Sequence, residues 1–161
     1  MNLDNYKFIK KINTNDFYLL QFDGASKGNG GESGGGSVLY KILLESKKKI
    51  FKYGEYLNNA TNNQAEYNGL IGGLKKAISL NIKNILIEGD SKLVIFQLLN
   101  LWKVKNEILK ELYNKVKELF NEFDSIGLRH IYREYNKKAD SIANDTVILK
   151  NNIYKIYKKN I

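Results

Sequence analysis

Residues 17–44 read FYLLQFDGASKGNGGESGGGSVLYKILL, and this stretch decides the fold. Residues 17–23 are aromatic and aliphatic, which is typical of a buried strand, and the run ends in Asp23. The glycine-rich segment 24–36 follows, and residues 37–44 form a second apolar run. Two apolar runs joined by glycines predict two consecutive strands with no helix between them.

The rest of the chain alternates between strand and helix patterns. Residues 49–57 predict a third strand, and the short connection at 45–48 predicts a hairpin with the strand before it. Thr61 and Gln64 have the spacing of a capping box at the start of the next helix. The order βββαβααβα predicts an α/β fold, a mixed five-stranded sheet with helices on both faces. Beyond the three strands, we predict helices over 61–80, 91–99, 106–123 and 136–149 and strands over 84–89 and 125–135.

The composition fits one folded domain with a polyanionic partner. The chain has 161 residues, of which 43% are hydrophobic, enough for a packed core. Its net charge of +9 favours a nucleic acid or another polyanion, although a charged surface or an AT-rich genome gives the same lysine excess. The absence of Cys excludes disulfides, thiolate metal sites and a cysteine nucleophile, and the single His130 excludes a His-rich zinc centre.

We divide the chain into a short N-terminal extension (1–16), one domain (17–149) and a basic C-terminal tail (150–161), for which we expect a frayed, solvated end. No apolar run is long enough to cross a bilayer, and the N-terminus lacks the pattern of a signal peptide. We therefore expect an intracellular protein, cytoplasmic by default, that is not secreted and has no membrane partner.

Four carboxylates stand in separate short motifs: Asp23, Glu66, Asp90 and Asp140. Asp23 and Asp90 each end an apolar strand, where desolvation penalises a charge unless something positive pairs with it. Taken singly, each acid has an ordinary explanation as a surface or helix-terminal charge. Taken together, at strand ends and early in helices, they predict a divalent metal centre. Oxygen ligands favour magnesium, manganese or calcium over zinc.

The glycine-rich segment is not a nucleotide-binding P-loop. It contains no GxxxxGK[ST] pattern, and a strand follows it where a P-loop has a helix. A flexible turn between strands is the simplest interpretation. We prefer the hypothesis that its backbone amides approach a substrate strand, because Lys27 and Asn29 offer polar contacts there.

Two further groups of residues have both structural and binding interpretations. Asn62 and Asn63 head the first predicted helix, and amides there either start the helix or read a nucleic-acid minor groove. Trp102 is typical of packing between helices, but Lys103 and Lys105 beside it favour a phosphate contact as an alternative.

The four carboxylate motifs, in this order, resemble those of type 1 ribonuclease H in its short form, which lacks a large basic handle. FDGASKGN around Asp23 resembles the first-strand motif of the family, TNNQAEYNGL around Glu66 its T-N-N-x-x-E helix motif, and EGDS around Asp90 its third motif. HIYREYNKKADSIAN, which contains Asp140, resembles H-V-P-R-E-x-N-x-x-A-D-x-L-A-N. The resemblance covers residues 17–149 and implies a ribonuclease H-like catalytic domain.

The resemblance implies a metal-dependent endonuclease that hydrolyses the RNA strand of RNA–DNA hybrids and leaves 3′-hydroxyl and 5′-phosphate ends. It implies two magnesium ions, replaceable by manganese. Asp23 is expected to bridge both ions, with Glu66 and Asp90 completing one site and Asp140 the other. His130 is expected to have a structural role or to support the metal ligands, and not to act as a general base.

Recognition of the hybrid is expected to use backbone and groove contacts, with weak sequence preference. In this interpretation Asn29, Asn62 and Asn63 contact 2′-hydroxyls of the RNA. Gln64 contacts the paired strand, and the lysines near Trp102 contact DNA phosphates. The expected substrate-binding residues are Gly24, Ser26, Lys27, Asn29, Asn62, Asn63, Gln64, Ser91, Trp102, Lys103, Lys105 and Asn136.

Two other hypotheses compete with this one: a DNA-directed nuclease of the same superfamily, and an inactive hybrid-binding module. Integrases order their acids Asp, Asp, Glu, whereas Glu66 precedes Asp90 here. An inactive module predicts lost acids, and all four positions are filled. We also expect a monomer, with double-stranded RNA as a further candidate substrate.

Overall fold

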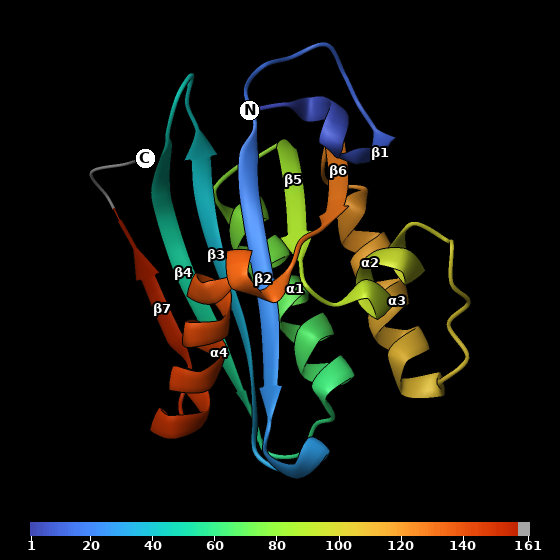
Figure 1. The fold of residues 1–161 in the computed structure, drawn as a ribbon, viewed down its shortest axis with the longest axis vertical. Helices are drawn as coiled ribbons and strands as arrows, with labels where there is room; N and C mark the ends of the chain where they lie inside the picture. The colour runs from blue at the N-terminus through green and yellow to red at the C-terminus, as the bar shows by residue number, and fades with distance from the viewer. Residues whose placement is uncertain (158–161) are drawn as a thin grey trace.

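A seven-stranded mixed sheet runs through the centre of the molecule in the order β1-β6-β5-β2-β3-β4-β7 (Figure 1). It is seen in a computed structural model, which describes residues 1–157. The strands are β1 (Lys7–Lys10), β2 (Tyr18–Ser26), β3 (Ser33–Ile42), β4 (Lys47–Leu57), β5 (Asn84–Gly89), β6 (Ser125–His130) and β7 (Ile153–Ile156). The helices are α1 (Asn62–Ser79), α2 (Lys92–Leu98), α3 (Glu107–Phe120) and α4 (Lys137–Leu149), with short 3-10 turns η1 (Leu3–Asn5), η2 (Lys27–Asn29) and η3 (Arg133–Tyr135).

The predicted α/β class, the mixed sheet and the order of its elements are confirmed, but the predicted count of five strands is wrong. β1 pairs antiparallel with β6, and β7 pairs antiparallel with β4, so the two added strands form the two edges of the sheet. Each has only four residues and a partner distant in sequence, so local pattern gives little signal for it. The expectation of a frayed tail is wrong for β7, while residues 158–161 lie outside the described residues.

The central strand β2 brings the ends of the sequence motifs together. β2 pairs antiparallel with β3 and parallel with β5, and Phe22 lies opposite Gly89. Asp23 and Asp90 therefore directly follow the last residue pair between these two neighbouring strands. Asp90 follows the end of β5 as predicted, but the prediction that the first strand ends at Asp23 is wrong, because β2 continues to Ser26 through its pairing with β3. β6 ends at His130, five residues before the predicted end of that strand, and η3 takes up residues 133–135.

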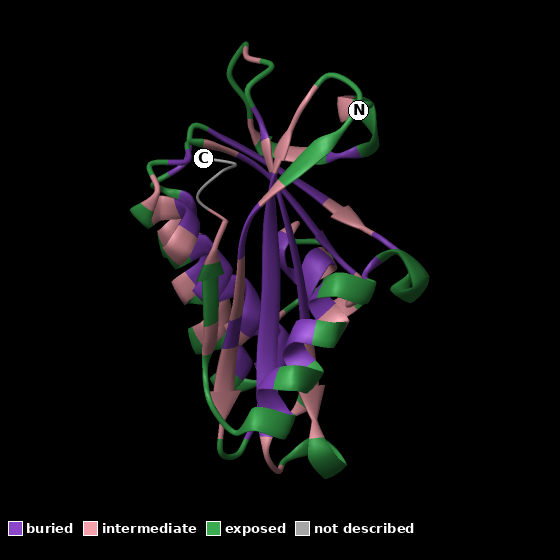
Figure 2. Ribbon diagram, turned by 90° about the vertical axis from the view of Figure 1, so that its left-hand side faces the viewer, coloured by how far each residue is buried: buried purple, intermediate pink, exposed green. Residues whose placement is uncertain are grey.

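Helices cover both faces of the sheet, as predicted. Figure 2 views the molecule from its β7 side, where buried strands lie between exposed helical surfaces. The larger core lies between the sheet and helices α1, α2 and α3, and contains Leu20, Phe22, Tyr67 and Leu70.

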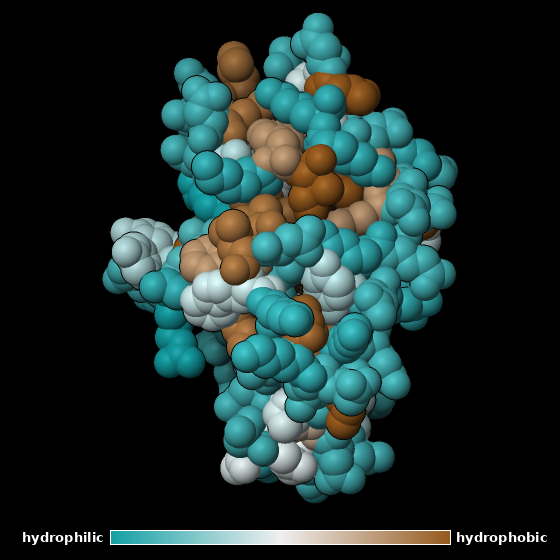
Figure 3. Space-filling view, turned by 90° about the vertical axis from the view of Figure 1, so that its right-hand side faces the viewer, coloured by the Kyte–Doolittle hydropathy of each residue, from teal (hydrophilic) through white to brown (hydrophobic). Residues whose placement is uncertain are grey.

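The second, smaller core lies on the α4 face of the sheet. It contains Leu19 and Leu86 from neighbouring strands, Val38 and Tyr40 from β3, and Ile142 from α4. Figure 3 shows the side of the molecule that carries β1, α2 and α3, where hydrophilic side chains surround a group of apolar ones. Within the described residues, no helix combines the length and apolar character that crossing a membrane requires.

Candidate metal centre and active site

Three of the four predicted acids meet at one point. Each of Asp23, Glu66 and Asp90 offers a carboxylate oxygen, and these oxygens all lie within 4.8 Å of one another. Asp23 is 4% exposed and Glu66 is 8% exposed, while Asp90 is half-buried. Three acids from β2, α1 and the end of β5 therefore share one partly enclosed space.

The approach of α1 to β2 is what places Glu66 beside Asp23. A Cβ added at Gly24 would lie 2.4 Å from the backbone nitrogen of Glu66, so only glycine permits this contact. Thr61 caps α1 by accepting from the backbone N–H of Gln64, and the Gln64 side chain accepts in return from the N–H of Thr61. The predicted capping box is confirmed, and it sets the start of the helix so that Glu66 falls in its second turn.

Asp140 is outside this close group of three but near enough to affect it. It is half-buried in the first turn of α4, and its Oδ1 accepts from Nδ2 of Asn144 at 3.2 Å. The side chain of Asp140 is the smallest of the causes that raise the pKa of Asp23, of which burial is the largest. The geometry fits a cluster of three acids with a fourth at its margin.

Burial makes this cluster a poor place for free carboxylates. Burial is the main cause of the rise in the pKa of Asp23 to about 7, and the neighbouring Asp90 charge contributes to it. Burial, followed by the charge of Asp23, also raises the pKa of Glu66 well above its ordinary value. Among the described residues, no hydrogen-bond partner reaches the buried Oε2 of Glu66. An unpartnered oxygen among crowded, desolvated acids fits a hard divalent cation.

Asn136 supports the acids from behind, and the prediction that it contacts substrate stays a prediction. Its side chain is fully buried at the start of α4. Nδ2 donates to the backbone oxygen of Phe22 at 2.8 Å and lies 3.4 Å from Oδ2 of Asp90. The residue was selected from its place in a motif, which gives no information on burial.

The residues predicted to read the RNA lie around the η2 turn and the start of α1. Oδ1 of Asn29 accepts from the backbone N–H of Asn62 at 2.8 Å, which joins the two segments. Ser26 contacts the same region, since its Oγ donates to the backbone oxygen of Ala60 and accepts from Gly30 N–H. The exposed Lys27 and the half-buried Asn63 flank this junction in sequence. Their contacts with substrate stay predictions.

Two of the predicted contacts have structural hydrogen bonds of their own. Oε1 of Gln64 belongs to the capping box of α1, and Oγ of Ser91 accepts from Val94 N–H at the start of α2. These bonds occupy one acceptor on each side chain. Substrate contact through the remaining donors of these side chains stays a prediction.

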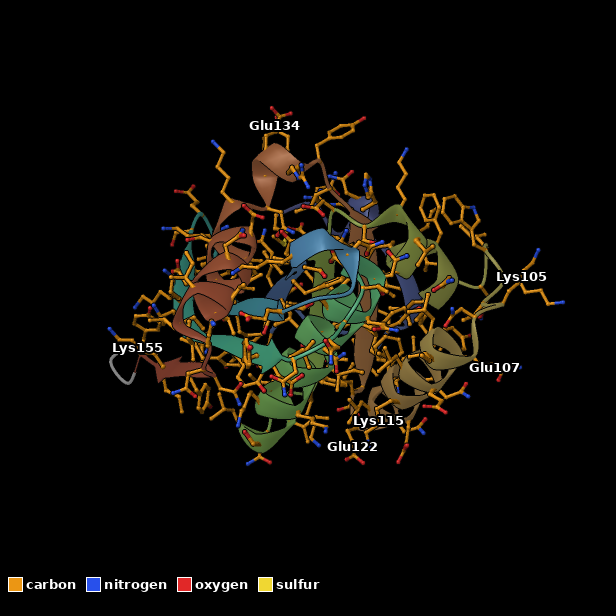
Figure 4. All side chains as sticks on the ribbon, turned by 90° about the horizontal axis from the view of Figure 1, so that it is seen from below. Lys105, Glu107, Lys115, Glu122, Glu134 and Lys155 are labelled. Atoms are coloured by element: carbon orange, nitrogen blue, oxygen red, sulfur yellow. The ribbon has the colours of Figure 1, made fainter. Side chains whose placement is uncertain are left out.

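The Trp102 segment forms a separate cleft between α2 and α3. Trp102 is 46% exposed and packs edge-on against Phe96, with ring centroids 5.1 Å apart. It lines a cavity of about 460 Å3 together with Lys103 and Lys110. Lys105 is exposed at the outer side of this region, at the right of Figure 4. None of the four acids lines this cleft.

His130 stands behind Asp90 and not inside the acid cluster. Its Nε2 lies 3.2 Å from the backbone oxygen of Asp90, and its ring contacts those of Phe96 and Tyr132. A ring nitrogen engaged with a backbone oxygen fits the predicted supporting role.

Basic residues beside Asp140 escaped the sequence interpretation. Arg133 and Lys137 line a cleft of about 580 Å3 together with Tyr132, Glu134 and Asp140. Figure 4 shows Glu134 at the rim of the molecule, on η3. The available signal was the pair of cations at fixed spacing before Asp140, inside a motif already quoted for its acid.

Comparison with known proteins agrees with this geometry. The family model described as "Reverse transcriptase-like" matches residues 21–146. A ribonuclease HI of Halobacterium salinarum is 36% identical over 130 residues, which cover 78% of this chain and 62% of the relative. A bifunctional protein of Mycobacterium tuberculosis is 38% identical over 134 residues, or 80% of this chain. The chain spans only 35% of the length of that curated relative.

Solved structures give the same result. The crystal structure of RNase H1 from Halobacterium salinarum has a TM-score of 0.76 at 34% identity, covering 83% of this chain and 98% of that one. An RNase H1 crystallised in complex with an RNA/DNA hybrid has a TM-score of 0.76 at 27% identity, with 83% and 98% coverage. The fold and the site define a ribonuclease H-like protein. Within that class, the chain belongs to the type 1 ribonuclease H family.

Proposed function

We propose that this protein is an endonuclease that uses divalent metal ions to hydrolyse the RNA strand of RNA–DNA hybrids, leaving 3′-hydroxyl and 5′-phosphate ends. The observation that carries the proposal is the meeting of Asp23, Glu66 and Asp90 within 4.8 Å in a chain of the type 1 ribonuclease H family. The relative solved with an RNA/DNA hybrid supports the choice of substrate.

The acids fit magnesium, which manganese would replace. Asp23 would bridge two ions, with Glu66 and Asp90 on one side and Asp140 on the other. When bound, such a pair of ions supplies an activated water and stabilises the leaving oxygen of a phosphodiester. The unpartnered Oε2 of Glu66 and the raised pKa of Asp23 support this assignment, because both indicate an environment short of positive charge.

The remaining residues of the site would position the substrate. Arg133 and Lys137 line the cleft beside Asp140, where they would neutralise phosphates of the cleaved strand. The junction of Asn29 and Asn62 would present amide groups to the 2′-hydroxyls that distinguish RNA from DNA. The N-terminus of α1, at Asn62, adds backbone N–H groups that favour an anion.

Three finer points belong to the same proposal. We infer that the protein acts as a monomer, that it is intracellular, and that double-stranded RNA is a further candidate substrate because it shares the 2′-hydroxyls of the hybrid. The net charge of +9 supports binding to any of these polyanions and does not rank them. The ranking depends on the experiment below.

The experiment compares end-labelled RNA–DNA hybrid, double-stranded RNA and duplex DNA, each with and without magnesium. Cleavage of the RNA strand of the hybrid, only with magnesium, is the expected result. Asp23→Asn purified in parallel should cleave nothing, which excludes a contaminating nuclease. Equal cutting of duplex DNA would favour the DNA-directed alternative, and hybrid binding without turnover would favour the inactive module.

A further inference from the structure

A row of lysines occupies one face of the sheet edge formed by β4 and β7. Along β3, Val38, Tyr40 and Ile42 point to the same face, and their partners on β4 are Lys52, Lys49 and Lys47. Lys155 of β7 lies directly opposite Lys52 and joins the same face. We call these four residues, Lys47, Lys49, Lys52 and Lys155, the lysine face.

A β-bulge builds this face. Phe51 pairs with Leu39 and Lys49 pairs with Tyr40, so the register skips Ile50. In a regular strand Lys49 and Lys52, three positions apart, would point to opposite sides, because side chains alternate along a strand; the bulge at Ile50 puts them on the same side. The bulge therefore gathers basic side chains that a regular strand would divide between two faces.

The pairing of Lys52 with Lys155 is unfavourable by itself. Like charges placed directly opposite on neighbouring strands destabilise a sheet. No carboxylate within residues 1–157 forms an ion pair with either lysine. The pairing of Lys52 with Lys155 concentrates positive charge at a cost to folding, and it is suited to a partner that brings many negative charges.

Aromatic rings hold the ammonium groups over this surface. Lys49 Nζ lies 5.4 Å and Lys155 Nζ 5.0 Å from the ring centre of Tyr157, and Lys47 Nζ lies 4.3 Å from that of Tyr40. Such contacts limit the rotamers of long side chains, so less entropy is lost when they bind phosphates.

The lysine face lies on the same side of the sheet as the helix that carries Asp140. Val38 and Tyr40 pack in the core with Ile142 of α4, and Gly54, two residues along β4 from Lys52, contacts Thr146 of that helix. Figure 4 shows Lys155 on the opposite side of the molecule from Lys105, so this surface is separate from the Trp102 cleft.

We propose that the lysine face binds a single-stranded nucleic acid, the unpaired flank of a hybrid held at the acid cluster. Charge complementarity identifies the partner as a polyanion. The aromatic rings among the lysines favour an unpaired strand, since grooves that bind single strands combine cations with aromatic rings. The inference rests on the proposed function only for the origin of that strand.

The test measures binding of a labelled oligothymidine of about 20 nucleotides, longer than the roughly 4–16 nucleotides of a typical single-strand site. It uses Asp23→Asn protein without divalent metal, across a series of salt concentrations. The assay measures binding to the lysine face whether or not the protein cleaves hybrids. Failure of this proposal is therefore distinguishable from failure of the proposed nuclease function.

A matched pair of double variants decides the result. The first variant, Lys52→Glu with Lys155→Glu, reverses the charges of the directly opposed pair on the lysine face. The second, Lys41→Glu with Lys48→Glu, reverses the charges of a directly opposed lysine pair that points to the opposite side of the sheet. We expect the first to weaken binding about tenfold and to reduce the slope of log K against log salt by about 1.4, two phosphate contacts at about 0.7 each. We expect the second variant to weaken binding by less than about twofold.

Equal losses in both variants would overturn the proposal, since net charge alone would then explain binding; no loss in the first variant would also overturn it. Tighter binding to vesicles containing phosphatidylserine than to the oligonucleotide, with the same loss in the first variant, would reassign the surface to a membrane. The single variant Lys52→Glu is the control for loss of binding through misfolding, because it replaces a repulsive pair with Lys155 by an attractive one. It should raise Tm while weakening nucleic-acid binding.

Discussion

The side chain of Asn136 donates a hydrogen bond to the backbone oxygen of Phe22 at 2.8 Å. Phe22 directly precedes Asp23, so this bond holds β2 next to the acid cluster. The same Nδ2 lies 3.4 Å from Oδ2 of Asp90, and the backbone oxygen of Asn136 accepts from Asp140 N–H at 3.1 Å. One buried residue therefore touches the segments that carry three of the four acids.

Asn136→Ala should reduce activity about 10- to 100-fold, the effect of losing a group that orients metal ligands. The loss should appear in kcat and in the magnesium concentration needed for half-maximal rate, and KM for the hybrid should change little. Asn151→Ala, at an exposed position after α4, is the control. A change confined to KM would indicate that Asn136 contacts substrate after all.

Gly24→Ala should also disrupt the site, because its Cβ would lie 2.4 Å from the backbone of Glu66 and 2.6 Å from that of Ala65. Backbone atoms cannot rotate away, so α1 must shift and carry Glu66 with it. We expect a loss of activity of more than about 100-fold, since small misplacements of reacting groups have effects of this size. Gly127→Ala, whose Cβ meets only side-chain atoms of Phe8 and Leu86, should retain most activity.

Metal-free protein should lose stability as the pH rises from about 4 to about 7. The folded state raises the pKa of Asp23 from 3.8 to about 7, so in this range it binds a proton that the unfolded chain has released. The stabilisation is complete at acidic pH and is lost as the pH rises through about 7. Thermal unfolding in the presence of a chelator measures this dependence.

The variant Asp23→Asn separates that effect from other titrations. It should unfold at a higher temperature than the unmodified chain at about pH 8, and the difference should shrink towards about pH 5. Addition of magnesium should stabilise the unmodified chain more than the variant. A pH-independent difference between the two proteins would show that Asp23 does not titrate as described.

Tyr6 ties the N-terminal segment to the sheet, because its hydroxyl donates to Oε2 of the buried Glu88 at 2.6 Å. Glu88 also accepts from Arg129 at 2.7 Å and from Gln21 at 2.9 Å. Tyr6→Phe should therefore lower the free energy of unfolding by about 1.5–3 kcal/mol, the range for a hydrogen bond to a charged group. Denaturant titration measures it, and hybrid cleavage at low temperature should be unchanged.

The sequence predicted the architecture wherever the local pattern was strong. The capping box at Thr61, the acid after β5 and the main helices all have local signals, and the structure agrees with them. β1 and β7 were missed because four-residue edge strands depend on partners far away in the chain. The bulge at Ile50 has no local signal for the same reason.

The candidate site was predictable only in part. Motifs selected the acids, because a charge at the end of an apolar strand is unusual at the level of sequence. They gave no information on burial, so the sequence did not show that Asn136, predicted to contact substrate, is fully buried. They also missed Arg133 and Lys137, which line the cleft beside Asp140 from η3 and from the first turn of α4.

Anomalous diffraction from crystals of this protein soaked in manganese, with a non-cleavable hybrid bound, tests the central claim most directly. We predict two peaks roughly 3.5–4 Å apart, with Asp23 between them, Glu66 and Asp90 at one and Asp140 at the other. Manganese bound elsewhere, with no peak among these four carboxylates, would contradict the account.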